Sequence, residues 1–217
     1  MQKNNTEAFL LKEKGNPEKA FLLSTISIET PKSDEVLIEV TSFGLNYADV
    51  MARNGLYKEA PPMPCVIGYE AVGTVTEVGR DVEKSWIGKR VVAFTRFGGY
   101  SKKVTTKVSA ITEIDDLDAA TALSLCTQSV TAFYMANYLA PIHRNEIVLI
   151  HAAAGGVGSI LIQLAKKAGA TVIAKIGNES KHELVKKLGA DCIINYNQSN
   201  YISEVEKYLN GKQKINI

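Results

Sequence analysis

The stretch EIVLIHAAAGGVGSILIQLAKKAG, residues 146–169, decides the fold of the second half of the chain. It begins as an apolar run typical of a buried strand and continues with apolar residues at helical spacing. Between these two parts, Ala153, Gly155 and Gly158 occupy the positions of a G-x-G-x-x-G motif, with alanine in the first. Glycines at this spacing permit a tight turn, close approach of a pyrophosphate and close packing of the helix on the strand. The stretch therefore predicts a strand, a phosphate loop and a helix in succession.

The predicted loop indicates a dinucleotide site, because the start of a helix presents unpaired N–H groups and a positive dipole to an anion. A plain tight turn between strand and helix is the alternative explanation of the glycines. The dinucleotide is favoured because strand, glycines, helix and a second strand occur in the order that the motif requires. The loop residues expected to bind the cofactor are Ala153, Gly155, Gly156, Val157 and Gly158.

The sequence around this stretch predicts two domains, 1–115 and 116–217. In the second, helices alternate with short apolar strands, which is typical of a parallel sheet with right-handed crossovers. In the first, short β-branched segments end at glycine-rich turns, which predicts a β-rich domain. The fold class is therefore α/β with a β-rich part. The clearest expected strands are 35–40, 70–79, 90–94, 102–107, 146–151, 171–175 and 192–195, and the expected helices are 47–55, 117–139, 157–169, 180–189 and 199–211.

The composition excludes several classes of protein. With 217 residues, 46% hydrophobic and 22% charged, the chain has the composition of a globular protein and not of a disordered or fibrous one. A net charge of +2 gives no reason to expect a nucleic-acid partner, and we expect no membrane span. The three cysteines are widely spaced and form no disulfide framework, so we expect a reducing compartment, the cytoplasm.

The choice between NADH and NADPH depends on the end of the second strand of the parallel sheet. An NAD site needs an acidic side chain there to accept a hydrogen bond from the ribose 2′-hydroxyl. Residues 174–178, AKIGN, contain no acid, and Lys181 follows them. A lysine at this place suits the 2′-phosphate of NADPH, although Glu179 lies close by and Lys181 could equally be a solvated helix residue. We therefore expect NADPH.

Five segments in order along the chain resemble one known family: GLNYADVMARNGLY (44–57), GYEAVGTVTEVG (68–79), GKRVVAF (88–94), HAAAGGVG (151–158) and SKHELVKKLGADCIINY (180–196). The family is the zinc-independent quinone oxidoreductase branch of the medium-chain dehydrogenase/reductase superfamily, and the chain is similar there to the vesicle amine transport protein homologues. The resemblance implies a GroES-like β domain followed by the first half of a Rossmann doubly wound parallel sheet. It also implies that NADPH binds between the two.

The resemblance bears on zinc as well. Zinc-dependent relatives carry G-x-C-x-x-D and G-H-E, where this chain has GLNYAD (44–49) and GYE (68–70). Asn46 and Tyr69 thus replace a thiolate and an imidazole, and Cys126 is better interpreted as a small apolar helix residue. Without soft ligands a tetrahedral zinc site cannot form, so we expect no metal.

The resemblance implies site residues in the first domain and at the start of the second. Asn46 corresponds to a position near the nicotinamide ribose, which implies a role in cofactor binding and catalysis; the alternative is a helix cap. Tyr57 corresponds to a catalytic-pocket residue, or else is a loop aromatic that covers the pocket. Thr131 is assigned to cofactor binding. Glu70 is interpreted as a structural hydrogen-bond acceptor.

The remaining implied residues would bind the 2′-phosphate. Lys181 matches the lysine that pairs with this group in the family, and Tyr196 matches a tyrosine that packs on it or donates to it. Asn178 and Ser180 lie in the same loop. The alternative for Tyr196 is a strand-end aromatic that caps the sheet.

The function that the resemblance implies is NADPH-dependent transfer of hydride to a quinone or an α,β-unsaturated carbonyl, a small-molecule substrate. The nicotinamide supplies the reducing power, and the protein supplies orientation and electrostatics. Two alternatives remain: an enoyl reductase of a biosynthetic pathway, and a cofactor-binding scaffold with little turnover.

The family pattern continues beyond residue 217, so we expect this chain to be a truncated form, or else one whose missing part another chain supplies. The fourth strand of the sheet would then be missing, and the outer edge of the strand at 146–151 would be bare. The family's homodimer is also in doubt for this chain, because it forms through the part of the sheet that lies beyond residue 217.

Overall fold

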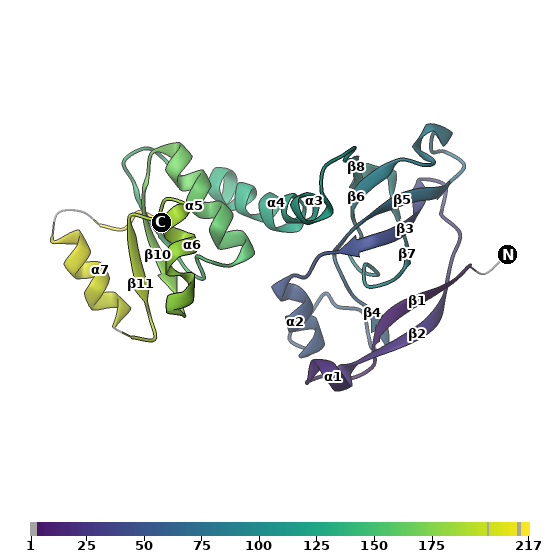
Figure 1. Cartoon of the computed structure of the whole chain (residues 1–217), viewed down its shortest axis with the longest axis horizontal. Coiled ribbons are helices and arrows are strands. Elements are labelled where there is room, and N and C mark those ends of the chain that lie inside the picture. The colour runs from purple at the N-terminus through teal and green to yellow at the C-terminus, as the bar shows by residue number, and fades with distance from the viewer. Residues whose placement is uncertain (1–3, 199, 212–213) are drawn as a thin grey trace. The chain divides into compact units, whose positions relative to one another are not determined.

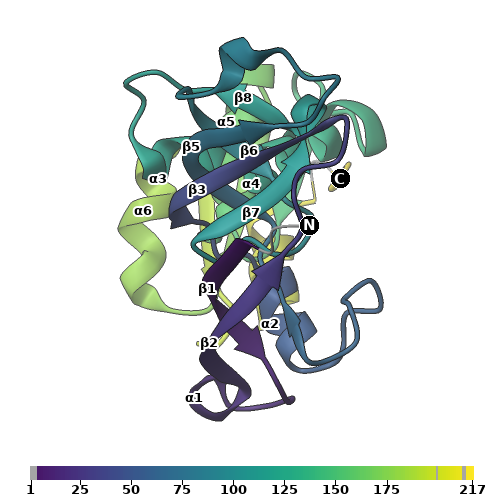
Figure 2. The ribbon, with the colours of Figure 1, turned by 90° about the vertical axis from the view of Figure 1, so that its right-hand side faces the viewer.

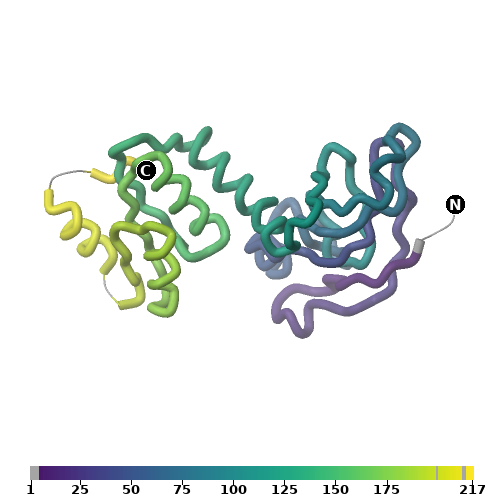
Figure 3. Tube along the Cα trace, turned by 45° about the horizontal axis from the view of Figure 1, so that its top comes forward, coloured from purple at the N-terminus to yellow at the C-terminus, as the bar shows by residue number. Residues whose placement is uncertain are grey.

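The computed structural model describes residues 4–198, 200–211 and 214–217. The chain divides into two compact units, the first ending at Thr127 and the second beginning at Gln128. Figure 3 traces it in order, purple to teal through the first unit and green to yellow through the second. The first unit extends beyond the expected boundary at residue 115 because helix α3, Ala119–Leu125, packs against its sheet through Ala122.

The first unit is built from antiparallel strands, as the punctuated β-branched segments predict. One sheet has the order β2-β1-β4. The other has the order β7-β3-β5-β6-β8, and its strands are labelled in Figure 2. The expected strands at 35–40, 70–79, 90–94 and 102–107 are confirmed as β3, β5, β6 and β7. The bounds are β1 Asn4–Leu11, β2 Phe21–Ile28, β3 Glu35–Phe43, β4 Cys65–Val66, β5 Glu70–Val78, β6 Arg90–Phe94, β7 Lys103–Lys107 and β8 Ile111–Glu113, with helices α1 Pro17–Ala20 and α2 Tyr47–Arg53.

The second unit holds a parallel sheet in the order β11-β10-β9, joined by helical crossovers. Its strands and helices agree with the predicted alternation, which confirms the first half of a Rossmann-type fold. The bounds are α4 Thr127–Tyr134, a π-helix Met135–Leu139, β9 Ile147–Ile150, α5 Gly156–Ala168, β10 Thr171–Ile176, a 3₁₀ turn Glu179–Lys181, α6 His182–Lys187, β11 Cys192–Asn195 and α7 Tyr201–Leu209.

The strands of this sheet bury both faces, so the doubly wound arrangement follows from their alternation. Val172 and Ala174 of β10 pack with α5 and α6, whereas Ile173 faces Val205 of α7. Figure 1 shows α5 and α6 on one side of the strands and α7 on the other. Such a sheet places the loops that follow its strands at one common edge, where open α/β sheets bind their ligands.

The helix predicted over residues 117–139 is interrupted, so this prediction is wrong in its continuity. α3 ends at Leu125, and Cys126 has a non-helical ψ of −107°. The amide of Thr127 donates 2.8 Å to Glu70 Oε2, so a carboxylate from a distant strand replaces the helical carbonyl acceptor. The helix restarts as α4.

The outer edge of β9 is partly covered, which corrects the expectation of a bare edge. Leu149 N donates to Ile217 O at 2.9 Å, and Asn216 N donates to Ile147 O at 3.0 Å. The side chain of Asn216 accepts from Ile147 N at 2.9 Å. The final residues therefore run along β9 where a fourth strand is expected.

In the described part of the chain, no helix has both the length and the apolar character that crossing a bilayer requires.

Candidate functional site

The glycine loop connects the carboxyl end of β9 to the first turn of α5. Ala152 has a φ of +48°, a left-handed conformation that is unusual for alanine, and its carbonyl accepts from Gly155 N at 2.8 Å. Ala153 is fully buried, and its amide donates to Lys175 O at 3.1 Å. The loop is therefore fastened both to itself and to β10.

Two glycines of the loop are required by close approach. A Cβ on Gly158 would lie 2.5 Å from Ala152 O and 2.8 Å from Ala153 Cα, so the helix can pack this close to the loop only with glycine. A Cβ on Gly156 would lie 2.0 Å from Oε1 of Gln128, so the side chain of Gln128 rests on the loop. The exposed Thr131 follows Gln128 by one turn of α4.

The loop fits the pyrophosphate of a dinucleotide. α5 has 13 residues, and it follows Gly155, an N-cap residue that has no side chain to cap the first turn. The amides at the start of a helix have no intrahelical acceptor, so those of Gly156, Val157 and Gly158 can donate to an anion.

The residues assigned to the 2′-phosphate come together at the carboxyl ends of β10 and β11. The side chain of Asn178 accepts from Ser180 N at 2.9 Å, which shapes the turn that leads to the exposed Lys181. A Cβ on Gly177 would lie 2.3 Å from Tyr196 Oη, so the phenol of Tyr196 rests on the start of the same turn. Within this unit the structure thus places Asn178, Ser180 and Lys181 in the turn after β10, and Tyr196 against Gly177 at the start of that turn.

Sequence reasoning did not assign Lys175 or Tyr201 to this region. The ammonium of Lys175 lies 3.4 Å from the ring centroid of Tyr201 and 5.3 Å from that of Tyr196. His151 meets Tyr201 edge to face at 6.4 Å. The available signal was the alternation of β10, which places Lys175 on the α7 face together with Ile173.

The first unit holds the other two predicted residues, Asn46 and Tyr57. Asn46 precedes α2, and its amide N–H donates to Asp49 Oδ2 at 2.9 Å. Its side-chain Nδ2 donates to Glu70 Oε1 at 2.9 Å. Asn46 therefore caps a helix, as the alternative proposed, and is also held by a buried carboxylate.

Glu70 accepts hydrogen bonds at both carboxylate oxygens. It is 1% exposed, with Asn46 Nδ2 on Oε1 and Thr127 N on Oε2. A Cβ on Gly44 would lie 2.0 Å from Oε1, so only glycine leaves space for this carboxylate. This geometry is that of a structural acceptor.

The same residues do not fit a zinc ion. Asn46 turns an N–H donor, and not a lone pair, toward Glu70. Burial, with Glu70 nearby, raises the pKa of Cys126 to about 12, so its sulfur is a thiol and not the thiolate that zinc binds. Among the residues that the structure describes, no group of three His, Cys, Asp or Glu side chains is placed to hold a metal.

Tyr57 belongs to an aromatic cluster. Its ring meets Tyr69 edge to face at 6.1 Å, and Tyr69 packs on Phe97 at 5.3 Å. Burial, with Tyr57 beside it, raises the pKa of Tyr69, so the phenol that stands at the histidine position of zinc enzymes stays protonated. Tyr57 is half-buried against the core around Ile67.

Comparison with known proteins agrees with this geometry. Residues 32–116 match the alcohol dehydrogenase GroES-like domain, and residues 156–215 match the zinc-binding dehydrogenase domain. The chain is 34% identical over 204 residues to the quinone oxidoreductase of Salmonella typhimurium, covering 92% of this chain and 61% of that protein. It is 33% identical over 179 residues to the synaptic vesicle membrane protein VAT-1 homolog of Rattus norvegicus, covering 82% and 44%.

Among solved structures, the Escherichia coli quinone oxidoreductase complexed with NADPH matches with a TM-score of 0.88 at 30% identity, covering 95% of this chain and 64% of that one. The chain thus spans about three fifths of the length of the quinone oxidoreductases it matches. With two domain models in family order and this shared fold, the chain belongs to the medium-chain dehydrogenase/reductase superfamily, in its quinone oxidoreductase branch.

Proposed function

We propose that this chain is an NADPH-dependent reductase that passes hydride to a quinone or an α,β-unsaturated carbonyl without zinc. The observation that carries the proposal is the start of α5 after the glycine N-cap Gly155, behind a loop that tolerates no Cβ at Gly158. The turn that ends in Lys181 follows β10, the strand that pairs with β9. The quinone oxidoreductase names and the NADPH complex of the relatives support the same assignment.

The chain's residues have separate tasks in this proposal. NADPH supplies the hydride, and the amides of residues 156–158 hold its pyrophosphate. The 2′-phosphate is bound by the side chains at the end of β10 and after β11, namely Asn178, Ser180, Lys181 and Tyr196. Thr131 is assigned to the nicotinamide half of the cofactor.

Asn46 and Tyr57 serve the substrate side of the proposed reaction. Glu70 fixes the amide of Asn46 before any ligand arrives, so this contact needs no reorganisation. The phenol of Tyr57 is a hydrogen-bond donor for the oxygen on which negative charge develops as hydride is accepted. Neither role requires a metal ligand.

The first test is isothermal titration of the 217-residue chain with NADPH and with NADH. NADPH is expected to bind more tightly than NADH. Lys181→Met is expected to weaken NADPH binding about tenfold and to leave NADH binding unchanged. Lys167→Met is the matched control, because Lys167 is an exposed lysine at the opposite end of α5. Equal affinity of the wild-type chain for the two cofactors would contradict the assignment of Lys181.

The second test is NADPH oxidation with a 1,2-quinone and with an α,β-unsaturated ketone, followed by absorbance. Turnover that falls in Asn46→Ala and Tyr57→Phe supports the reductase. Tight NADPH binding with no turnover on either acceptor supports the scaffold alternative.

A further inference from the structure

Lys175 is a cation that the rest of the described chain leaves without an acidic partner. Its ammonium lies 3.4 Å from the ring centroid of Tyr201, and no carboxylate among the described residues forms an ion pair with it. Aromatic faces attract a cation and do not neutralise it. Lys175 is half-buried, so water screens its charge less than it screens a surface lysine.

The position of Lys175 ties this charge to the candidate cofactor site. Its carbonyl accepts from Ala153 N, inside the glycine loop, at 3.1 Å. Its ammonium also lies 5.3 Å from the ring of Tyr196, the tyrosine that rests on Gly177. Lys175 is therefore at the carboxyl end of β10, between the pyrophosphate loop and the turn that ends in Lys181.

The charges of this segment also favour a role for a second cation when a dianion binds. Between Lys175 and Lys181 the chain carries one acid, Glu179, which accepts from Asn195 at 3.3 Å. Lys181 alone would be offset by Glu179, and a phosphate monoester carries a charge of about −1.5 to −2 at neutral pH. With Lys175 the segment has a net positive charge.

We propose that Lys175, held by Tyr201 and Tyr196, is a second cation for the 2′-phosphate of NADPH and helps to set the preference for NADPH over NADH. This inference rests on the proposed function. Tyr201 acts as a positioning residue, since its ring fixes where the ammonium stands. Lys175 itself would contact the phosphate.

The experiment is a titration of the whole 217-residue chain with adenosine 2′,5′-bisphosphate and with adenosine 5′-monophosphate, which differ in the 2′-phosphate alone. Lys175→Met is expected to weaken the bisphosphate about tenfold and to leave the monophosphate unchanged. Lys175→Arg keeps the positive charge and can stack on the tyrosine ring, so it is expected to lose less affinity for the bisphosphate than Lys175→Met does. Lys167→Met is the matched control for the loss of one positive charge.

A pair of tyrosine variants tests the positioning without altering the lysine. Tyr201→Phe keeps the aromatic face, so its affinity for the bisphosphate is expected to equal that of wild type. Tyr201→Leu removes the face, so a several-fold loss confined to the bisphosphate is expected. This pair carries the test should Lys175→Met fail to fold, as judged by far-UV circular dichroism.

The outcomes separate this inference from the proposed function. A wild-type chain that prefers the bisphosphate, with Lys175→Met and Tyr201→Leu binding as well as wild type, overturns the role of Lys175 and leaves the NADPH assignment standing. A wild-type chain that binds both nucleotides equally, or neither, overturns the NADPH assignment and this inference with it.

Discussion

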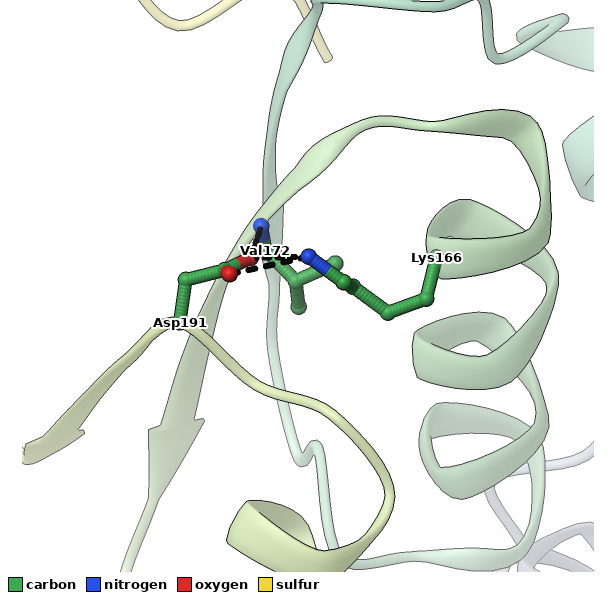
Figure 4. A network of polar contacts seen from close by, with 3 residues as sticks. All are labelled: Lys166, Val172 and Asp191. Atoms are coloured by element: carbon green, nitrogen blue, oxygen red, sulfur yellow. Dashed lines mark hydrogen bonds and ion pairs between the residues drawn. The ribbon is translucent and has the colours of Figure 1, made fainter.

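Lys166 and Asp191 form a bidentate ion pair, in which the lysine Nζ lies 2.8 Å from each carboxylate oxygen (Figure 4). Asp191 Oδ2 also accepts from the amide of Val172 at 2.7 Å. One carboxylate therefore joins the last turn of α5 to the start of β10 from the loop that precedes β11. This tie lies at the amino ends of the strands, opposite the phosphate loop, so it stabilises the sheet without being part of the site.

Removing the two partners is expected to have unequal effects. Asp191→Ala leaves the Val172 amide without its side-chain acceptor and should lower the free energy of unfolding by about 1–3 kcal/mol. Lys166→Met removes only the ion pair, whose side chains are 35% and 34% exposed, and should cost about 0.5–1 kcal/mol. Urea denaturation followed by circular dichroism measures both. Equal losses in the two variants would show that the Val172 hydrogen bond contributes nothing.

Gly158→Ala tests the packing of α5 on the phosphate loop. The added methyl would meet the backbone of Ala152 and Ala153, which cannot move aside as a flexible side chain can, so the free energy of unfolding should fall by about 1–3 kcal/mol. Affinity for NADPH should fall with it, because the shifted helix start misplaces its amides. Lys167→Ala, in the same helix, is the control and should change neither quantity.

Glu70 and Asn46 permit a test by exchange of donor and acceptor. Glu70→Gln turns an NH₂ toward either Asn46 or the Thr127 amide, and should lower the free energy of unfolding by about 1–3 kcal/mol. Asn46→Asp alone should also destabilise, because it sets two carboxylates against each other. The double variant restores a donor opposite each acceptor and should recover much of the loss. If the double variant loses as much free energy of unfolding as the two single variants together, the hydrogen bond between Asn46 and Glu70 does not contribute to stability.

Much of this fold could be predicted because its signals are local. The alternation of β10, the helical spacing of α5 and the glycines between β9 and α5 each lie within a few residues. The grouping of Asn178, Lys181 and Tyr196 was accessible only through family resemblance, because it joins the ends of two different strands.

The errors arose where distant parts of the chain meet. The break at Cys126 depends on Glu70, 57 residues before the amide that it accepts from. The cover over the edge of β9 depends on Asn216 and Ile217, and the position of Lys175 depends on which face of the sheet α7 covers. Periodicity within one segment contains none of this information.

Cys126 should be the least reactive of the three cysteines. Burial beside Glu70 raises its pKa to about 12 from an ordinary value of 9.0, so at pH 8 it is ionised far less often than an ordinary thiol. Alkylation with iodoacetamide, read by mass spectrometry, should therefore modify Cys65 and Cys192 before Cys126. Rapid labelling of Cys126 in the folded chain would contradict its burial.

The same shift predicts how stability depends on pH. The folded state binds the Cys126 proton more tightly than the unfolded state does, so stability is retained below pH 9 and lost as the pH rises from 9 toward 12. Cys126→Ala has no thiol to ionise. The difference in free energy of unfolding between wild type and this variant should therefore narrow in that range, and a constant difference would show that the thiol does not titrate there.

Asn216 and Ile217 test whether the last residues stabilise β9. Asn216→Ala leaves the Ile147 amide without its side-chain acceptor and should lower the free energy of unfolding by about 1 kcal/mol. Deleting residues 214–217 also removes the backbone hydrogen bonds of Asn216 and Ile217 to β9 and the packing of Ile215 and Ile217, so the loss should be larger. The exposed Lys214→Ala is the control. Because the deletion bares an apolar strand edge, it should form oligomers in size-exclusion chromatography where the control does not. A deletion variant that elutes and melts like wild type would show that these residues do not protect the edge.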